Sequence, residues 1–164
     1  MPPSGWAVAA QACDASWEVD ASTAHGGARS LLLRSADRTS GIELRSDAFA
    51  VSSGQEHYFT CWAKIARGAI DHTWGQTVAA ARIYWLDASA REISNSEILR
   101  VAYTARNWTR FTRKLVAPAG ATSARVGLGV SGSVPNDDLS TENAVWFDDL
   151  EFWPTPPSMM RAPV

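Results

Sequence analysis

The sequence predicts an all-β domain, either a sandwich or a barrel. Short runs with period-two character recur along the chain, and turn-rich segments such as 52–56, 118–121 and 131–138 separate most of them. Many short strands at such spacing favour a sandwich or barrel over βαβ units. The expected strands are 30–35, 41–46, 57–65, 78–86, 108–116, 123–131 and 144–153.

The segment 87–105 is the one stretch that could be written as a helix. Asn95 and Ser96 interrupt it, and its apolar positions do not hold a 3.6-residue period. We therefore expect a turn at 87–91 followed by one or two strands. The Pro-rich tail 154–164 is expected to be a linker, because its prolines remove backbone donors, so the domain is expected to cover residues 1–153.

Length and charge limit the classes of function. At 164 residues the chain is long enough for one domain with its own core. The formal net charge of −2 gives no support for a nucleic-acid partner, which would show as a basic face. No apolar run approaches the roughly 20 residues of a membrane span, and the first residues lack the basic region of a signal peptide. We expect neither a nucleic-acid nor a membrane partner.

Period two assigns the residues of the segment 57–65 to two faces. One set is small and apolar, and we expect it to face the core. The other set points away from the core and includes Trp62 and Lys64. The expected core set is Phe59, Cys61, Ala63 and Ile65.

The same rule places further side chains on outward faces. Arg82 and Tyr84 lie on the outward face of 78–86, and Gly127 and Gly129 lie on the outward face of their own strand. Glycines on such a face leave room for a ligand to approach the backbone closely. This pattern is typical of a binding surface built from rings, cations and bare backbone, and equally of an ordinary solvated face with a few exposed aromatics.

Two adjacent carboxylates, Asp148 and Asp149, stand inside the apolar and aromatic run 143–153. Neighbours on a strand point to opposite faces, so the two should not form the convergent acid pair of a glycosidase. Asp148 shares a face with Trp146, which we interpret as the core side. A buried carboxylate needs a cation or several donors, so calcium, backbone N–H groups and an arginine are all candidate partners.

Other motifs give little chemistry. Cys13 and Cys61 are too far apart for a metal or redox motif, and Cys61 is expected to be buried. A disulfide between them and two separate thiols both remain open. The segment 127–132 matches GxGxxG, but no helix is expected to follow it, so we do not expect a dinucleotide site.

Several stretches, taken in order, resemble the carbohydrate-binding modules of families 4, 9, 16 and 22, which have a galactose-binding-domain-like fold. The resemblance spans roughly residues 5–153. It implies a jelly-roll β-sandwich of two antiparallel sheets, appended to a secreted polysaccharide-degrading enzyme. The stretches are 5–6, 19–34, 58–65, 82–93, 107–111, 117–130 and 144–153.

The resemblance also implies a structural calcium ion at the edge of the sandwich. In the family the aspartate of the last strand and a turn after a His-Gly pair hold the ion, and these match Asp148 and the turn from Gly27 to Ser30. We therefore expect backbone oxygens around Gly27 and Ala28, with Ser30 as a further candidate. The family's third ligand, an acidic residue near the N-terminus, has no match in this sequence.

We expect a non-catalytic module that binds a polysaccharide or oligosaccharide by ring stacking and a few polar contacts. A catalytic domain in the same parent chain and an extracellular location follow from the resemblance. The loop 67–77 joins the two strands with outward aromatics and should overhang the same face. The candidate ligand-binding residues are Trp74, Tyr84, Trp62, Arg82, Lys64 and Tyr103.

Two rival hypotheses belong to other classes of function. A small jelly-roll lyase or hydrolase would need an acid and a base that converge in one cleft, and the sequence shows no such constellation. A structural accessory domain would bury its exposed aromatics against a neighbouring domain and bind no glycan.

Overall fold

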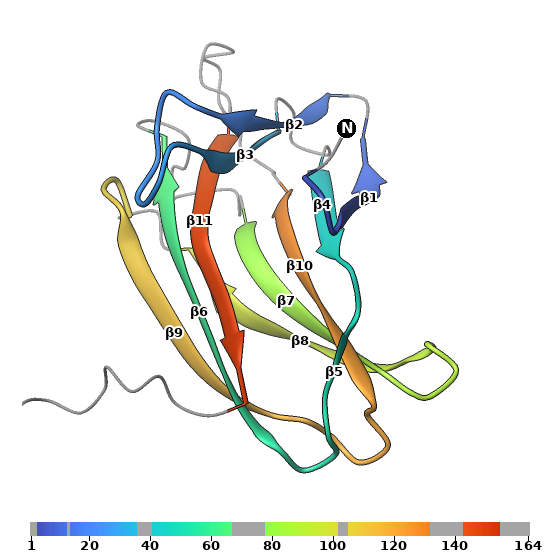
Figure 1. The fold of residues 1–164 in the computed structure, drawn as a ribbon. Coiled ribbons are helices and arrows are strands. Elements are labelled where there is room, and N and C mark those ends of the chain that lie inside the picture. The colour runs from blue at the N-terminus through green and yellow to red at the C-terminus, as the bar shows by residue number, and fades with distance from the viewer. Residues whose placement is uncertain are drawn as a thin grey trace, which may run out of the picture.

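The computed structural model describes residues 3–12, 14–35, 41–66, 78–101, 105–131 and 143–154. Two antiparallel sheets pack face to face, and the described residues contain no helix (Figure 1). The predicted all-β jelly-roll sandwich is therefore confirmed. The predicted linker after Trp153 lies almost entirely outside the described residues.

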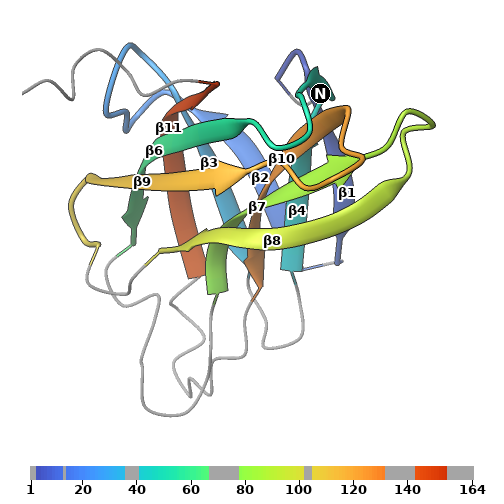
Figure 2. The same cartoon turned by 90° about the horizontal axis from the view of Figure 1, so that it is seen from below.

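We name the larger sheet, which has six strands, sheet A. Its strands follow the order β1, β4, β10, β7, β8 (Figure 2). The short β5, which is labelled in Figure 1, also pairs with β10. All pairings are antiparallel. The strands are β1 (Trp6–Gln11), β4 (Gly41–Ser46), β5 (Phe49–Ala50), β7 (Val78–Leu86), β8 (Glu92–Arg100) and β10 (Ser123–Ser131).

Sheet B has five strands in the order β2, β3, β11, β6, β9, and its pairings are also antiparallel. The first and last strands of the described chain therefore lie in different sheets. The strands are β2 (Ala15–Asp20), β3 (Ser30–Ser35), β6 (Glu56–Ile65), β9 (Thr109–Val116) and β11 (Asn143–Trp153).

The core lies between the sheets and follows the predicted alternation. The expected core residues of β6 are all buried, as are Ile83 and Trp85 of β7. In β10 the apolar residues are buried and Arg125 is exposed. The predicted turn and strand after residue 87 are confirmed by β8. The buried β6 residues are Phe59, Cys61, Ala63 and Ile65.

The strands β1 and β2 were not expected from the pattern. Most of their side chains are exposed or half-buried, so neither strand shows a clear apolar period. They form the edges of the two sheets on the same side of the sandwich (Figure 1). Edge strands bury less apolar surface, and the signal from hydrophobic alternation is correspondingly weak.

Strand β11 contains a bulge that the alternation rule could not anticipate. Asp148 lies opposite Trp62, and Glu151 lies opposite Thr60, so β11 uses one residue more than β6 over this step. Asp149 has a φ of 47°, in the left-handed region that an extended strand does not use. The bulge shifts the inward–outward alternation by one residue, so the side chains before and after it do not follow a single period-two pattern.

Among the buried titratable side chains of the described residues, Cys61 and His57 face the core. Burial raises the pKa of the Cys61 thiol to about 12, which makes it an inert apolar side chain at neutral pH. Its potential partner Cys13 lies outside the described residues. His57 is 2% exposed, and neither of its ring nitrogens has a hydrogen-bond partner. Its ring stacks on Phe152 with the centroids 4.8 Å apart.

Candidate functional site

The outer face of sheet A carries a groove with a volume of about 450 Å³. Gly129 of β10 and Ala80 of β7 contribute small residues to its lining, and β1 contributes Ala10. Glu43 and Arg82 bring the charged groups, from β4 and β7 respectively. A cavity of this size with a few convergent polar groups is typical of a small-ligand or oligomer site.

Two glycines of β10 place no side chain on this face of sheet A. A Cβ atom on Gly127 would lie 2.8 Å from Cε2 of Tyr84 and 3.3 Å from Cδ of Glu43. A Cβ atom on Gly129 would lie 3.2 Å from the carbonyl oxygen of Ile42. The absence of a side chain at Gly127 therefore lets Tyr84 lie across β10, and the absence of one at Gly129 leaves the backbone there partly exposed.

Tyr84 is held in a network that spans three neighbouring strands. Its hydroxyl donates to the carboxylate of Glu43, at 2.9 and 2.8 Å from the two oxygens. The Arg45 guanidinium stands over the Tyr84 ring, 3.8 Å from its centroid, and pairs with Glu43. Burial, together with the hydrogen bond to Glu43, raises the pKa of Tyr84, so the hydroxyl stays a donor at neutral pH.

On the outer face of sheet B side chains also cover aromatic rings, although Trp62 and Trp146 are half-buried whereas Tyr84 on sheet A is 4% exposed. The His25 ring stacks on Trp62 with the centroids 3.7 Å apart and the planes at 15°. The Lys64 ammonium lies 5.3 Å from the centroid of the Trp146 ring. The indole N–H of Trp146 donates to Asp20 at 2.7 Å. These contacts occupy the surfaces with which Trp62 and Trp146 would meet a ligand.

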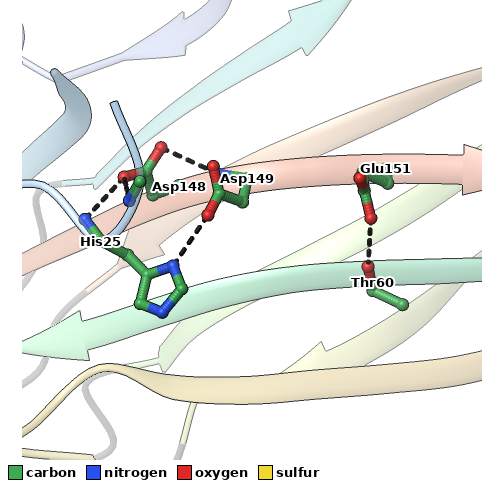
Figure 3. Close-up of polar contacts among 6 residues, drawn as sticks. His25, Thr60, Asp148, Asp149 and Glu151 are labelled. Carbon is green, nitrogen blue, oxygen red and sulfur yellow. Dashed lines mark hydrogen bonds and ion pairs between the residues drawn. The ribbon is translucent and has the colours of Figure 1, made fainter. Parts of the chain in front are cut away.

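A carboxylate pair fastens the segment after β2 to this face (Figure 3). Oδ2 of Asp148 accepts the backbone N–H groups of His25 and Gly26, at 2.7 and 3.1 Å. Its Oδ1 accepts the N–H of Asp149 at 2.8 Å. Asp149 in turn contacts Nδ1 of His25 at 2.7 Å. We call the set His25, Gly26, Asp148 and Asp149 the carboxylate clamp.

The clamp corrects two predictions about the aspartates. Asp148 does share a face with Trp146, but that face is the outer face of sheet B and not the core side. Asp148 is nevertheless 8% exposed, because the segment around His25 covers it. The two aspartates were also expected to point to opposite faces, whereas both contact His25. The bulge and the positive φ of Asp149 bring them together.

The clamp supplies only part of what a calcium site needs. Calcium takes six to eight oxygen ligands, whereas Asp148 is already bonded to three backbone N–H groups. Ser30 donates its hydroxyl proton to the carbonyl of Thr23. Within the described ranges no group of three His, Cys, Asp or Glu side chains is arranged to hold a metal. The donor set therefore matches a hydrogen-bonded turn better than a complete metal centre.

The candidate ligand-binding residues divide between the two sheets. Tyr84 and Arg82 lie on the outer face of sheet A, and Trp62 and Lys64 lie on the outer face of sheet B. The expectation that Trp62 lies beside Tyr84 on one surface is therefore wrong. Alternation shows that a side chain points away from the core, but it does not show from which sheet.

Two further candidates, Trp74 and Tyr103, lie outside the described residues. Sequence reasoning also missed Glu43 and Arg45 in the segment 41–46. Their outward positions could have been read from the same period-two rule, because Ile42 and Leu44, which alternate with them, are buried.

No pair of acids converges in the groove within the part of the chain that the structure describes. Glu43 is the one carboxylate among the groove-lining residues in those ranges. Hydrolysis of a glycosidic bond by the common route needs two carboxyl groups on either side of the bond. The described groove offers hydrogen-bonding groups and charges rather than that constellation.

Neither a protein-family model nor a curated protein sequence matches the chain. Solved structures do match. The family 22 carbohydrate-binding module joined to the catalytic module of xylanase 10B from Clostridium thermocellum, complexed with xylohexaose, is 16% identical with a TM-score of 0.61. The match covers 94% of this chain and 26% of that one.

Two further structures are similar. The second family 22 xylan-binding domain of a Paenibacillus barcinonensis xylanase is 14% identical with a TM-score of 0.58, and 91% of each chain is covered. The enzymatically active domain of tailspike protein 4 from bacteriophage CBA120 is 15% identical with a TM-score of 0.65. The match covers 91% of this chain but only 19% of the tailspike chain. The chain therefore has the jelly-roll fold found in carbohydrate-binding modules.

Proposed function

We propose that the chain is a non-catalytic carbohydrate-binding module that holds a polysaccharide chain in the groove over sheet A. The observation that carries this proposal is the groove itself. Its small lining residues leave backbone accessible, and Glu43 and Arg82 stand beside it on rigid strands. A preformed surface of this kind can bind hydroxyl groups without a large ordering penalty.

The comparisons support this proposal through the fold. Neighbours with the same jelly-roll fold include xylan-binding domains and a module complexed with xylohexaose. Attachment to a catalytic domain and an extracellular location remain parts of the proposal. So does ring stacking by Trp74 and Tyr103, which lie outside the described residues.

The proposal predicts that the isolated chain binds a soluble polysaccharide in affinity electrophoresis or calorimetry against a glycan panel. It also predicts that incubation with the panel releases neither reducing ends nor unsaturated products. Binding of no glycan would favour a structural accessory domain, and product release would favour an enzyme.

A matched pair of variants locates the site. Ala10 is exposed on β1 beside the groove, whereas Thr112 is exposed on the outer face of sheet B. Ala10→Leu puts a branched side chain into the groove and should weaken binding about tenfold. Thr112→Leu adds the same side chain to the other face and should leave binding unchanged. The reverse result would place the site on sheet B.

We further propose, from the family resemblance alone, that calcium binds at Asp148 with backbone oxygens around Gly27 and Ala28 and with Ser30. An ion that binds only the folded chain stabilises it by RT ln(1 + [L]/Kd). EDTA should then lower the thermal midpoint, and Asp148→Ala should abolish that response. A midpoint that EDTA leaves unchanged would mean that the three N–H bonds to Asp148 hold the turn without an ion.

A further inference from the structure

The central strands of sheet A present more positive than negative charge to the outside. On β4, β7 and β10 the outward charged residues are three arginines and one glutamate, although the whole chain has a net charge of −2. The local balance is therefore opposite to that of the molecule. The residues are Arg45, Arg82, Arg125 and Glu43.

Two of the arginines have no carboxylate partner among the described residues. Arg45 pairs with Glu43, whereas neither Arg82 nor Arg125 forms an ion pair with a carboxylate in the part of the chain that the structure describes. Glu97 of β8 lies opposite Arg82 in register, yet its carboxylate pairs with Arg100 at 3.2 Å. Arg82 also lies within hydrogen-bonding reach of Tyr84. Both arginines are exposed residues, so their guanidinium groups can meet a ligand from solvent.

Arg82 and Arg125 are diagonal neighbours on adjacent strands. Arg82 lies opposite Gly127, and Arg125 lies two residues before Gly127 on β10. Diagonal positions of this kind are about 7–8 Å apart at Cα, within reach of long side chains. Gly127 adds no side chain of its own, and the Tyr84 ring lies across it, between the two arginine positions. Because arginine side chains are long, the two guanidinium groups can approach one anionic group from either side of that ring.

Tyr84 is poorly placed to supply the stacking platform that the sequence suggested. The Arg45 guanidinium occupies one face of its ring, and the ring lies across the backbone at Gly127. Its hydroxyl is committed to Glu43. On the described part of this face, the groups left to contact a ligand are mainly charged ones.

We propose that this face selects an acidic polysaccharide, with a uronate carboxylate bound by Arg82 and Arg125. The proposal rests on the proposed function and specifies its substrate class. A guanidinium fork matches the geometry of a carboxylate, and such charge-assisted hydrogen bonds are stronger than bonds to a neutral hydroxyl. Because both groups are solvent-exposed, the contribution is screened by salt.

The test compares one polysaccharide in two forms. A glucuronic-acid-bearing xylan and its carboxyl-reduced product have the same backbone and differ in whether the acid is a carboxylate or a primary alcohol. In calorimetry at low salt, the wild-type chain should bind the acidic form at least about tenfold more tightly. Added salt should reduce this difference, while binding of the reduced form should stay nearly constant.

Variants with a matched control complete the test. Arg125→Gln, which lies outside the groove lining, should weaken binding of the acidic form about tenfold and leave the reduced form unaffected. Arg82→Gln, inside the groove, should weaken the acidic form about tenfold more than it weakens the reduced form. Arg110 is exposed on the outer face of sheet B, so Arg110→Gln should change neither. Circular dichroism spectra that match the wild type would show that each variant is folded.

The possible outcomes separate the two proposals. Equal binding of the acidic and reduced forms, or equal losses for both forms in the arginine variants, would overturn the acidic selectivity and leave glycan binding standing. Tighter binding of a sulfated xylan than of the uronate form would overturn the assignment to a carboxylate. Binding of no polysaccharide in any form would overturn the proposed function itself.

Discussion

On the outer face of sheet A small residues leave backbone accessible, whereas on the outer face of sheet B a loop and long side chains cover the strands. The Tyr84 ring fits on sheet A because Gly127 has no side chain. The Trp62 ring on sheet B is covered by His25, which the carboxylate clamp fixes in place. The outward ring is covered on both faces, by Arg45 on sheet A and by His25 on sheet B, so the two faces differ in the accessible backbone and not in an open aromatic ring. The neighbours of an outward aromatic residue therefore decide whether it can meet a ligand.

The largest effect is expected when the Asp148 carboxylate is removed from the carboxylate clamp. Asp148→Ala leaves three backbone N–H donors without their carboxylate in a buried position. We expect a loss of about 3 kcal/mol in the free energy of unfolding, and a thermal midpoint lower by roughly 6–12 °C. Thermal unfolding followed by circular dichroism measures this change.

Asp149→Ala is the matched control for the clamp. Its side chain is 42% exposed, and its contact with His25 is a surface interaction, so the loss should be below about 1 kcal/mol. Glycan affinity should stay at the wild-type value in both variants, measured at a temperature at which each is folded. Loss of affinity in folded Asp148→Ala would mean that the two faces are coupled.

A smaller effect is expected from the network on sheet A. Tyr84→Phe removes the hydroxyl that donates to Glu43 and should lower the free energy of unfolding by about 1–2 kcal/mol. Because Glu43 lines the groove, the variant should also weaken glycan binding. Urea unfolding and calorimetry measure the two effects. Tyr58→Phe is the control on sheet B, and an equal loss of affinity there would contradict the assignment of the groove.

The buried His57 should make the stability of the domain depend on pH. Desolvation lowers the pKa of buried His57 below the ordinary value of 6.5, so the unfolded chain binds a proton more readily than the folded chain. The free energy of unfolding is therefore not reduced by His57 protonation above pH 6.5, where His57 is neutral in both states. It decreases as the pH falls from 6.5 toward the lower pKa of the folded state, because only the unfolded chain then takes up the proton. Urea unfolding at about pH 7.5 and about pH 5.5 should show a lower stability at the acidic value.

His57→Leu should remove this part of the pH dependence. It should also stabilise the domain by about 1 kcal/mol, since it removes two buried nitrogens that have no hydrogen-bond partner. His25→Ala, on the covered outer face of sheet B, should retain the His57 contribution. A wild-type pH profile in His57→Leu would show that other groups cause the acid sensitivity.

The smallest effect is expected from Lys64 on sheet B. Its ammonium lies near Trp146 at the surface, so Lys64→Gln should change the free energy of unfolding by less than about 0.5 kcal/mol. Glycan affinity should be unchanged, in contrast to Arg82→Gln. If Lys64→Gln weakened binding as strongly, sheet B would have to carry part of the site.

The sequence was sufficient for the strands whose two sides differ in polarity. In β6 the alternation places Cys61 inside and Trp62 outside, and the structure agrees. It was insufficient where a long-range pairing decides the outcome. Period two could not assign Trp62 and Tyr84 to different sheets, because the order of strands depends on contacts between distant segments.

The candidate site was only partly predictable for a related reason. Arg82 was expected at the surface, and its exposed position beside the groove agrees with that expectation. The importance of Glu43 and Arg45 emerges only when β4 is seen beside β10, since they meet Tyr84 across a glycine. The carboxylate clamp could not be predicted, because the left-handed conformation of Asp149 does not change the pattern of apolar residues in the sequence.

The bulge in β11 also bears on how the chain would tolerate a deletion. Losing one residue from an ordinary strand turns every following side chain to the other face, so such deletions usually destroy a sheet. In β11, removal of Asp149 would leave Glu151 opposite Thr60 and Phe152 opposite Phe59, as they are now, with Leu150 opposite Cys61. The strand therefore carries one residue that serves the attachment of the His25 segment and is dispensable for the sheet, and sequences of this fold without it would align here across a one-residue gap.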